Sequence, residues 1–321
     1  MIFQIFIFSF SILILAFLGS KLIKTLTRLA NFLNIRGFVI AFFLMAFATS
    51  LTNFFFALGS AVAGVPELSL GDILGGNLGD LTLVMALVIF FSKEKISANS
   101  KMVQSSAVFT AIAVILPLIL ILDGRLTRID GIILYMSFIA YSIWIFSKRE
   151  RFKNDESEKI NVGVFSFFQF IKDIFIIIIL LVLLVISTQV IIYSAQSFAE
   201  HLNMSLSLVG VLIVGLANCF PEAYFSIVAA KKGDGWLVLG EMMGSVIICA
   251  TLILGTVAIV SPFEIKDMSS LLIARIFTII AAIFFLVAIK TDRAFTKKEG
   301  LILLGVYIAF LLVEIFKPQI F

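Results

Sequence analysis

The dominant pattern in the chain is a series of long apolar stretches separated by short polar connections. About 20 consecutive apolar residues cross the roughly 30 Å hydrocarbon core of a bilayer as a helix. A membrane β-barrel would instead show alternating segments of about ten residues. We therefore predict an all-α membrane protein with ten transmembrane helices. Their approximate bounds are 2–18, 37–63, 69–91, 102–122, 130–147, 164–195, 205–230, 236–260, 268–289 and 300–316.

The first stretch is long and apolar enough to resemble a secretory signal peptide. No basic residues precede it, and Gly19-Ser20-Lys21 follows it in place of a small-residue cleavage motif. We therefore expect residues 2–18 to form the first transmembrane helix.

Composition supports the same class. Of the 321 residues, 61% are apolar and 14% charged, against about 45–50% and about 25% in soluble domains. The expected surroundings are therefore a lipid bilayer, and the net charge of +4 reports topology rather than a nucleic-acid partner. Cys219 and Cys249 lie inside apolar stretches and form no paired motif, so we expect neither a disulfide nor a paired cysteine metal site.

Lysine and arginine are distributed unevenly between the two sides. The odd-numbered connections hold 19 of them and the even-numbered connections, with the C-terminal end, hold 4. Because cytoplasmic loops are enriched in these residues, we predict a multi-pass protein of the cell membrane with both termini outside.

The longest polar connection, residues 148–163, divides the chain into two halves of five predicted helices. We predict a first half at 1–147, a cytoplasmic linker at 148–163 and a second half at 164–321. A regulatory ion site or partner site in the linker is the alternative to a simple solvated connection.

The two halves contain a repeat at an offset of 169 positions. Residues 46–58 align with 215–227, and residues 70–83 align with 239–252, including Gly71 with Gly240 and Gly75 with Gly244. Because each half has an odd number of spans, the second copy must enter the membrane upside down. Inverted repeats are typical of secondary transporters, whose substrate site lies near the midplane between the repeats.

Polar residues gather in these repeated blocks, although polar groups inside a membrane are costly and usually line an ion site or a water-filled path. The set comprises Thr49, Ser50, Asn53, Asp72, Asn77, Asp80, Asn218, Glu222 and Glu241.

At this point the chain resembles the cation/calcium exchanger superfamily, which includes the sodium/calcium exchangers. That family has ten helices in two inverted halves, each with a motif G-T-S-x-P-E followed by G-N-x-x-G-S-N-x-x-D/N. The first copy here reads ATSLTN at 48–53 and GDILGGNLGD at 71–80; the second reads ANCFPE at 217–222 and GEMMGSVIIC at 240–249. The α-repeats implied by the resemblance are 37–91 and 206–260.

The resemblance implies an ion site with four central positions, which are Asn53, Asp80, Glu222 and Cys249 here. Glu222 keeps the family's residue, Asp80 supplies a carboxylate where an amide is frequent, and Asn53 and Cys249 lack one. Further oxygen ligands implied by position are Thr49, Ser50, Asn218 and Ser245.

The number of carboxylates in the predicted site affects which cation it can bind. Ca²⁺ takes about 6–8 oxygen ligands, usually with several carboxylates, whereas Glu222 and Asp80 supply two. Weak Ca²⁺ binding, preference for another divalent cation or for Na⁺, and exchange of H⁺ through a buried carboxylate all remain open. No cofactor is expected besides the transported cations.

Asp72 and Glu241 replace the family's paired asparagines, one in each repeat. They either interact with the positive end of a half-helix dipole or act as proton or cation relays along each access path.

The leading hypothesis is a secondary active cation antiporter, not an enzyme, with alternating access to a site at Glu222 and Asp80. The alternative is a non-transporting ion-binding sensor derived from an exchanger. An intramembrane aspartyl protease is disfavoured, because the segment NLGD at 77–80 lacks the first glycine of the Gly-x-Gly-Asp motif.

Overall fold

The structure is a computed structural model that describes residues 2–32, 46, 47, 49–147, 167–265, 268–291 and 293–320. Its α-helices are α1 (Ile2–Phe32), α3 (Leu51–Val62), α4 (Pro66–Gly79), α5 (Met85–Phe91), α6 (Lys101–Leu120), α7 (Arg128–Ser147), α8 (Phe167–Leu202), α9 (Leu206–Val209), α10 (Gly215–Lys232), α11 (Gly235–Ile247), α12 (Leu254–Val260), α13 (Met268–Thr291) and α14 (Lys297–Ile320). Short helical turns are η1 (Asp80–Val84), η2 (Ile121–Asp123), η4 (Gly210–Val214) and η5 (Ile248–Ile253), and the strands are β1 (Ile96–Ser97), β2 (Arg125–Leu126), β3 (Phe263–Glu264) and β4 (Ala294–Phe295).

Seven helical segments within the described ranges are long and apolar enough to cross a membrane. They are Pro66–Phe91, Lys101–Asp123, Arg128–Ser147, Ile171–Leu202, Leu206–Lys232, Gly235–Val260 and Leu271–Thr291. These seven coincide with the third to ninth predicted stretches, which confirms a helical membrane protein with several spans. The beginning of the stretch 37–63 and the predicted linker 148–163 lie outside the described residues.

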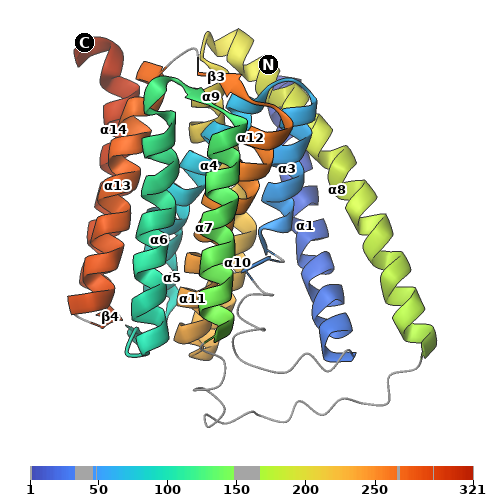
Figure 1. Ribbon diagram of the computed structural model, residues 1–321, viewed down its shortest axis with the longest axis vertical. Coiled ribbons are helices and arrows are strands. Elements are labelled where there is room, and N and C mark those ends of the chain that lie inside the picture. The colour runs from blue at the N-terminus through green and yellow to red at the C-terminus, as the bar shows by residue number, and fades with distance from the viewer. Residues whose placement is uncertain are drawn as a thin grey trace.

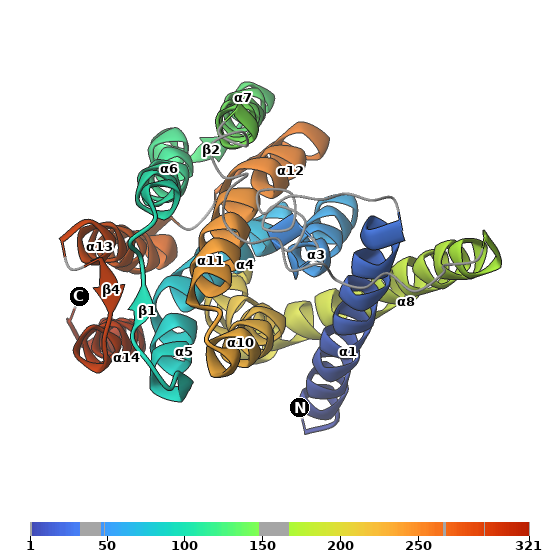
Figure 2. The same ribbon diagram turned by 90° about the horizontal axis from the view of Figure 1, so that it is seen from below.

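The helices form a bundle with two central segments. Pro66–Phe91 and Gly235–Val260 are the most enclosed spans, with 78% and 83% of their apolar windows buried. Figure 2 shows α4 and α11 in the middle, with α6, α7, α13 and α14 on one side. Helices α1 and α8 lie side by side at the opposite edge of the bundle (Figures 1 and 2).

Three of the spans are interrupted by π-helical turns. η1 begins at Asp80, η5 includes Cys249, and η4 precedes α10. A π-helical turn shifts the backbone hydrogen-bond register by one residue and is frequent at functional sites. Two of the three turns therefore fall on positions that the sequence places in the ion site.

Close helix packing around α4 depends on two of the repeated glycines. A Cβ on Gly75 would lie 2.7 Å from the Val211 Cα, and one on Gly71 would lie 3.0 Å from the Gly210 Cα. The predicted close approach of helices at these glycines is present between α4 and the α9–η4 segment.

Two short ribbons join connections that are far apart in sequence. β1 pairs antiparallel with β4 through Ile96 and Phe295, and β2 pairs antiparallel with β3 through Leu126 and Phe263. β3 and β4 lie at opposite ends of the bundle (Figure 1), so each ribbon ties one end of the molecule.

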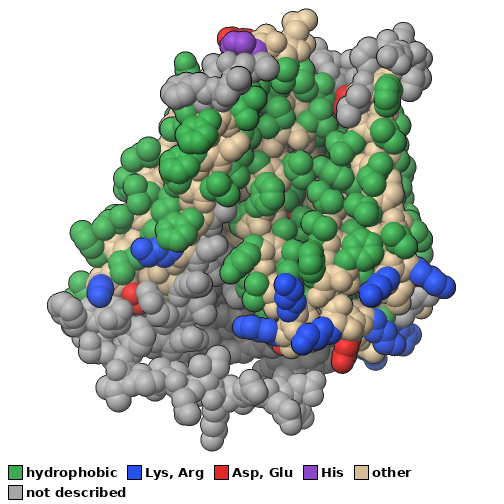
Figure 3. Space-filling model, turned by 180° about the vertical axis from the view of Figure 1, so that it is seen from behind, with side chains coloured by type: hydrophobic (Ala, Val, Ile, Leu, Met, Phe, Trp, Pro, Cys, Tyr) green, Lys and Arg blue, Asp and Glu red, His purple; other side chains and the backbone are tan. Residues whose placement is uncertain are grey.

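Charge on the surface is segregated along the bundle axis. Figure 3 shows lysine and arginine side chains gathered toward the end that carries β4, with a broad hydrophobic band above them. α1 begins and α14 ends at the other end (Figure 1). The orientation of these ends across the membrane stays a prediction.

Replacing Gly75 with alanine should destabilise the bundle, because the added Cβ would meet the Val211 backbone. We expect the free energy of unfolding in mixed micelles to fall by about 1–3 kcal/mol, the usual cost of overpacking. Gly305→Ala is the control, since its Cβ would meet nothing within 4 Å and helix propensity favours alanine by about 1 kcal/mol. Equal stability of Gly75→Ala and Gly305→Ala would contradict the packing described.

Candidate functional site

The predicted site residues come together at the centre of the bundle. They lie on or beside α3, α4 with η1, α10, and α11 with η5. Every one of them is buried, and none is more than 8% exposed. The set is Thr49, Ser50, Asn53, Asp72, Asp80, Asn218, Glu222, Glu241, Ser245 and Cys249.

Asn53 on α3 contacts one residue of α10 and one of η5. Its Nδ2 donates a hydrogen bond to Glu222 Oε1 at 3.1 Å and lies 3.4 Å from Cys249 Sγ. Asn53 and Glu222 are 169 positions apart, the offset at which the two halves align. Residues that occupy the same place in each copy are therefore in direct contact.

Asp80 supplies the second central carboxyl group. It interacts with the thiol of Cys219 and lies within electrostatic range of Glu222. Within the described part of the chain, three oxygens of this centre have no hydrogen-bond partner: Asn53 Oδ1, Asp80 Oδ1 and Glu222 Oε2. Buried polar atoms are normally hydrogen-bonded, so these three atoms are available to a ligand.

A small cavity lies against this cluster. It is lined by Asn53, Asp72, Asp80, Asn218 and Cys249, together with Ile73, Gly76, Asn77 and Cys219. About 10 Å³ is open to the centre of a water-sized sphere, which is room for roughly one water molecule or one bare cation. Glu222 meets the cavity through its hydrogen bond to Asn53 rather than by lining it.

Asp72 and Glu241 are held by side chains of the facing helix. Asn218 Nδ2 donates to Asp72 Oδ1 at 2.8 Å. Ser226 Oγ donates to Glu241 Oε2 at 2.7 Å, and Thr49 also interacts with this carboxyl group. Both acids lie in the second turn of their helices, α4 and α11, whereas dipole stabilisation is confined to the first turn. Neither acid therefore lies in the first turn of its own helix, and the choice between helix-dipole stabilisation and a relay role stays a prediction.

Contacts made by residues of one repeat recur at the corresponding positions of the other repeat. Ser50 Oγ donates to Ser245 Oγ at 3.3 Å, and Cys219 Sγ lies 3.4 Å from the Gly76 carbonyl. Cys219 corresponds to Ser50 and Gly76 to Ser245 at the offset of 169. The Asn218 contact with Asp72 corresponds in the same way to the Thr49 contact with Glu241.

Sequence reasoning missed Ser226, which donates a hydrogen bond to Glu241. Asn77, one of the polar residues of the repeated blocks, lines the cavity, and Cys219 interacts with Asp80. Ser226 lies four residues after Glu222 and eight after Asn218, so helical spacing would have placed it on the same face.

Cationic side chains are scarce near this centre. The buried Arg275 on α13 donates to the Leu118 carbonyl at 2.8 Å. It forms no ion pair with the buried acids of the site, which are Asp72, Asp80, Glu222 and Glu241. No group of three or more His, Cys, Asp and Glu side chains within the described ranges is arranged to hold a metal ion by itself. Any bound cation would therefore also need amide, hydroxyl or carbonyl oxygens.

The bundle of apolar helices around buried acidic side chains defines a helical membrane protein with several spans. Comparison with known proteins gives its family. The sequence profile of the sodium/calcium exchanger protein family matches residues 3–147 and 172–316. The chain therefore belongs to the sodium/calcium exchanger family, and the resemblance on which the expectations above were based is confirmed.

Individual relatives are distant but extend over nearly the whole chain. A membrane protein of Methanocaldococcus jannaschii, MJ0091, is 24% identical over 92% of this chain and 93% of its own length. The sodium/calcium exchanger MaX1 of Methanosarcina acetivorans is 23% identical over 91% of this chain and 92% of its own length.

The structure also matches solved structures of the sodium-calcium exchanger NCX_Mj. For a form soaked with Na⁺ and Sr²⁺ the TM-score is 0.66, at 21% identity, covering 97% of this chain and 98% of the other. At this identity the likeness shows a shared fold. The relatives named here are membrane proteins or exchangers rather than enzymes.

The hydrogen bond between Asn218 and Asp72 can be measured by a double-mutant cycle. Because it is buried and joins an amide to a carboxyl group, we expect Asn218→Ala and Asp72→Ala to show a coupling of about 1.5–3 kcal/mol in unfolding free energy. Asn218→Ala combined with Asp123→Ala, a residue of the exposed ion pair with Arg125, should be additive within about 0.5 kcal/mol. Additivity of the first pair would contradict the contact.

Proposed function

We propose that the protein is a secondary active cation antiporter whose ion site is formed by Glu222 and Asp80. The site would open alternately to the two sides of the membrane. Asn53, Thr49, Ser50, Asn218, Ser245 and Cys249 complete the surroundings of the ion, with oxygen ligands from the amide and hydroxyl groups.

The contact between Asn53 and Glu222 carries this proposal. It joins the same position of both repeats at the centre of the bundle, at a distance of 3.1 Å. Beside it are unpaired oxygens of three buried side chains and a cavity of about the size of one cation. An ion held here touches both halves at once, which is what a site between two repeats requires.

Electrostatics favours a positively charged substrate. An isolated ionised carboxylate is very costly to bury unless it is paired, and Glu222 and Asp80 are 0% and 3% exposed. A divalent cation, Ca²⁺ or another, neutralises this pair of carboxylates, and Na⁺ or H⁺ are the exchange partners that the same groups can hold. Sodium and calcium are also the ions named for the exchanger relatives.

We further propose ten transmembrane helices in two inverted halves, with both termini outside. Support comes from the contacts that recur at the offset of 169 and from the two ribbons, which tie opposite ends of the bundle. The domain bounds 1–147, 148–163 and 164–321 stay predictions, as does the relay role of Asp72 and Glu241.

Removing either central charge should stop transport. In proteoliposomes, Glu222→Gln and Asp80→Asn should each lower cation-coupled flux by about 100-fold, since a lost ligand costs at least as much as a lost supporting group, while expression and thermal stability are kept. Glu314→Gln is the control, because this buried carboxyl group lies on α14, and it should transport normally. Unchanged flux in both central variants would reject the site.

Adding a carboxylate should strengthen Ca²⁺ binding. Asn53→Glu and Cys249→Asp each place a charge where the family has one, and Ca²⁺ affinity rises with the number of charged ligands. We expect the apparent Kd for Ca²⁺ to fall by about ten-fold in calorimetric titrations. Asn53→Gln, which lengthens the side chain without a charge, should not strengthen binding, and an equal gain in that variant would count against the charge argument.

A further inference from the structure

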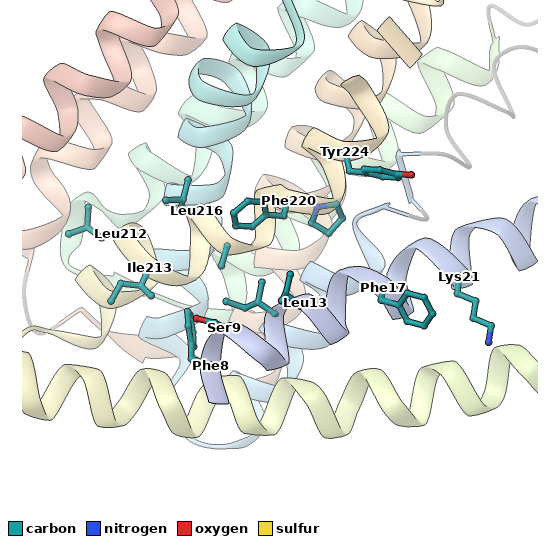
Figure 4. Close-up of a pocket in the computed structure, with 13 residues that line it drawn as sticks. Phe8, Ser9, Leu13, Phe17, Lys21, Leu212, Ile213, Leu216, Phe220 and Tyr224 are labelled. Carbon is teal, nitrogen blue, oxygen red and sulfur yellow. The ribbon is translucent and has the colours of Figure 1, made fainter. Parts of the chain in front are cut away.

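A long groove opens between α1 and α10, away from the cation site. Its volume is about 850 Å³, within the range of roughly 300–1,000 Å³ found for ligand pockets. Figure 4 shows Leu13, Phe17 and Lys21 of α1 along one side of it, and Phe220 and Tyr224 of α10 along the other. Apart from Ser9, Lys21 and Tyr224, the lining side chains are apolar.

The groove and the cation site use different faces of the same helix. Leu216, Phe220 and Tyr224 line the groove at intervals of four residues. Asn218, Glu222 and Ser226, also four residues apart, carry the hydrogen bonds of the buried centre. The two series are offset by two positions, which is about 200° around a helix of 3.6 residues per turn. A molecule in the groove therefore packs on the back of the helix that holds Glu222.

The polar groups of the groove are concentrated at one end. Lys21 is exposed there, and Tyr224 points its hydroxyl group toward the same end (Figure 4). No ion pair of Lys21 is present within the part of the chain that the structure describes. This end faces the basic side of the bundle seen in Figure 3. Tyrosine is typical of the membrane interface, where its ring is apolar and its hydroxyl group meets the head groups.

The length of the groove suits one lipid chain. From Phe8 to Lys21, α1 rises about 20 Å at 1.5 Å per residue, somewhat more than half of the roughly 30 Å hydrocarbon core. A chain anchored at Lys21 would reach past the bilayer midplane to the level of Phe8.

We propose that this groove is a binding site for an anionic phospholipid, with the phosphate at Lys21 and Tyr224 and one acyl chain between α1 and α10. Juxtamembrane lysines attract anionic lipid head groups, and the apolar walls accept the chain. Pro221 lines the groove and lies inside α10. Since a proline removes a backbone hydrogen bond and allows a helix to bend, the bound lipid supports α10 at the turn next to Glu222.

Lipid binding is tested with purified protein in neutral phosphatidylcholine micelles, titrated with phosphatidylglycerol and followed by native mass spectrometry. The wild type should bind phosphatidylglycerol about five-fold more tightly than phosphatidylcholine, as expected for one lysine at the head group. Lys21→Gln should lose this preference, whereas Lys95→Gln, at an exposed lysine that does not line the groove, should keep it. Inorganic phosphate should not compete, which distinguishes a lipid from a free anion.

The proposed binding of an acyl chain is tested by filling the groove with a larger side chain. Leu13→Trp should abolish binding of phosphatidylglycerol, while Leu301→Trp should not, although Leu301 is similarly exposed on α14 at 61% against 68%. A retained preference for phosphatidylglycerol in Lys21→Gln, retained binding in Leu13→Trp, or competition by inorganic phosphate would overturn the proposal. This experiment measures lipid binding and not transport. Its result can therefore be interpreted even if the antiporter proposal fails.

Discussion

The structure depends on the placement of four carboxyl groups in a membrane interior, where ionised groups without partners are very costly. Asp72, Asp80, Glu222 and Glu241 are at most 3% exposed. Two of them, Asp72 and Glu241, accept hydrogen bonds from neutral side chains of neighbouring helices. Glu222 accepts one from Asn53 and lies within electrostatic range of Asp80. Among the described residues, Asp80, Glu222 and Glu241 each keep one oxygen without a hydrogen-bond partner. In the antiporter that we propose, a cation from outside the protein completes this centre.

The backbone is adapted to the same requirement. Small residues let α4 approach the η4 segment at Gly71 and Gly75, and this contact brings Asn218 to Asp72. The π-helical turns at Asp80 and around Cys249 re-aim residues within otherwise continuous spans. Because α10 carries Glu222 on one face and lines the groove with the other, the proposed lipid and the proposed ion site would act on a single helix.

Much of this arrangement could be predicted from the sequence. The offset of 169 placed Asn53 opposite Glu222 in the repeat, and seven of the ten predicted spans coincide with long apolar helices in the described residues. The donors to the carboxyl groups were harder to predict, because Ser226 and Cys219 are ordinary small residues until helix rotation is known. The groove could not be predicted either, since it results from the separation of α1 and α10, which no local pattern encodes.

The central claim is that one cation binds between Asp80 and Glu222, and locating that cation in a crystal soaked with Ca²⁺ tests it most directly. The account predicts a single strong density peak in the central cavity, about 2.3–2.6 Å from carboxylate oxygens of both residues. Ca²⁺ bound elsewhere in the bundle, with these two side chains still turned to Asn53 and Cys219, would contradict it.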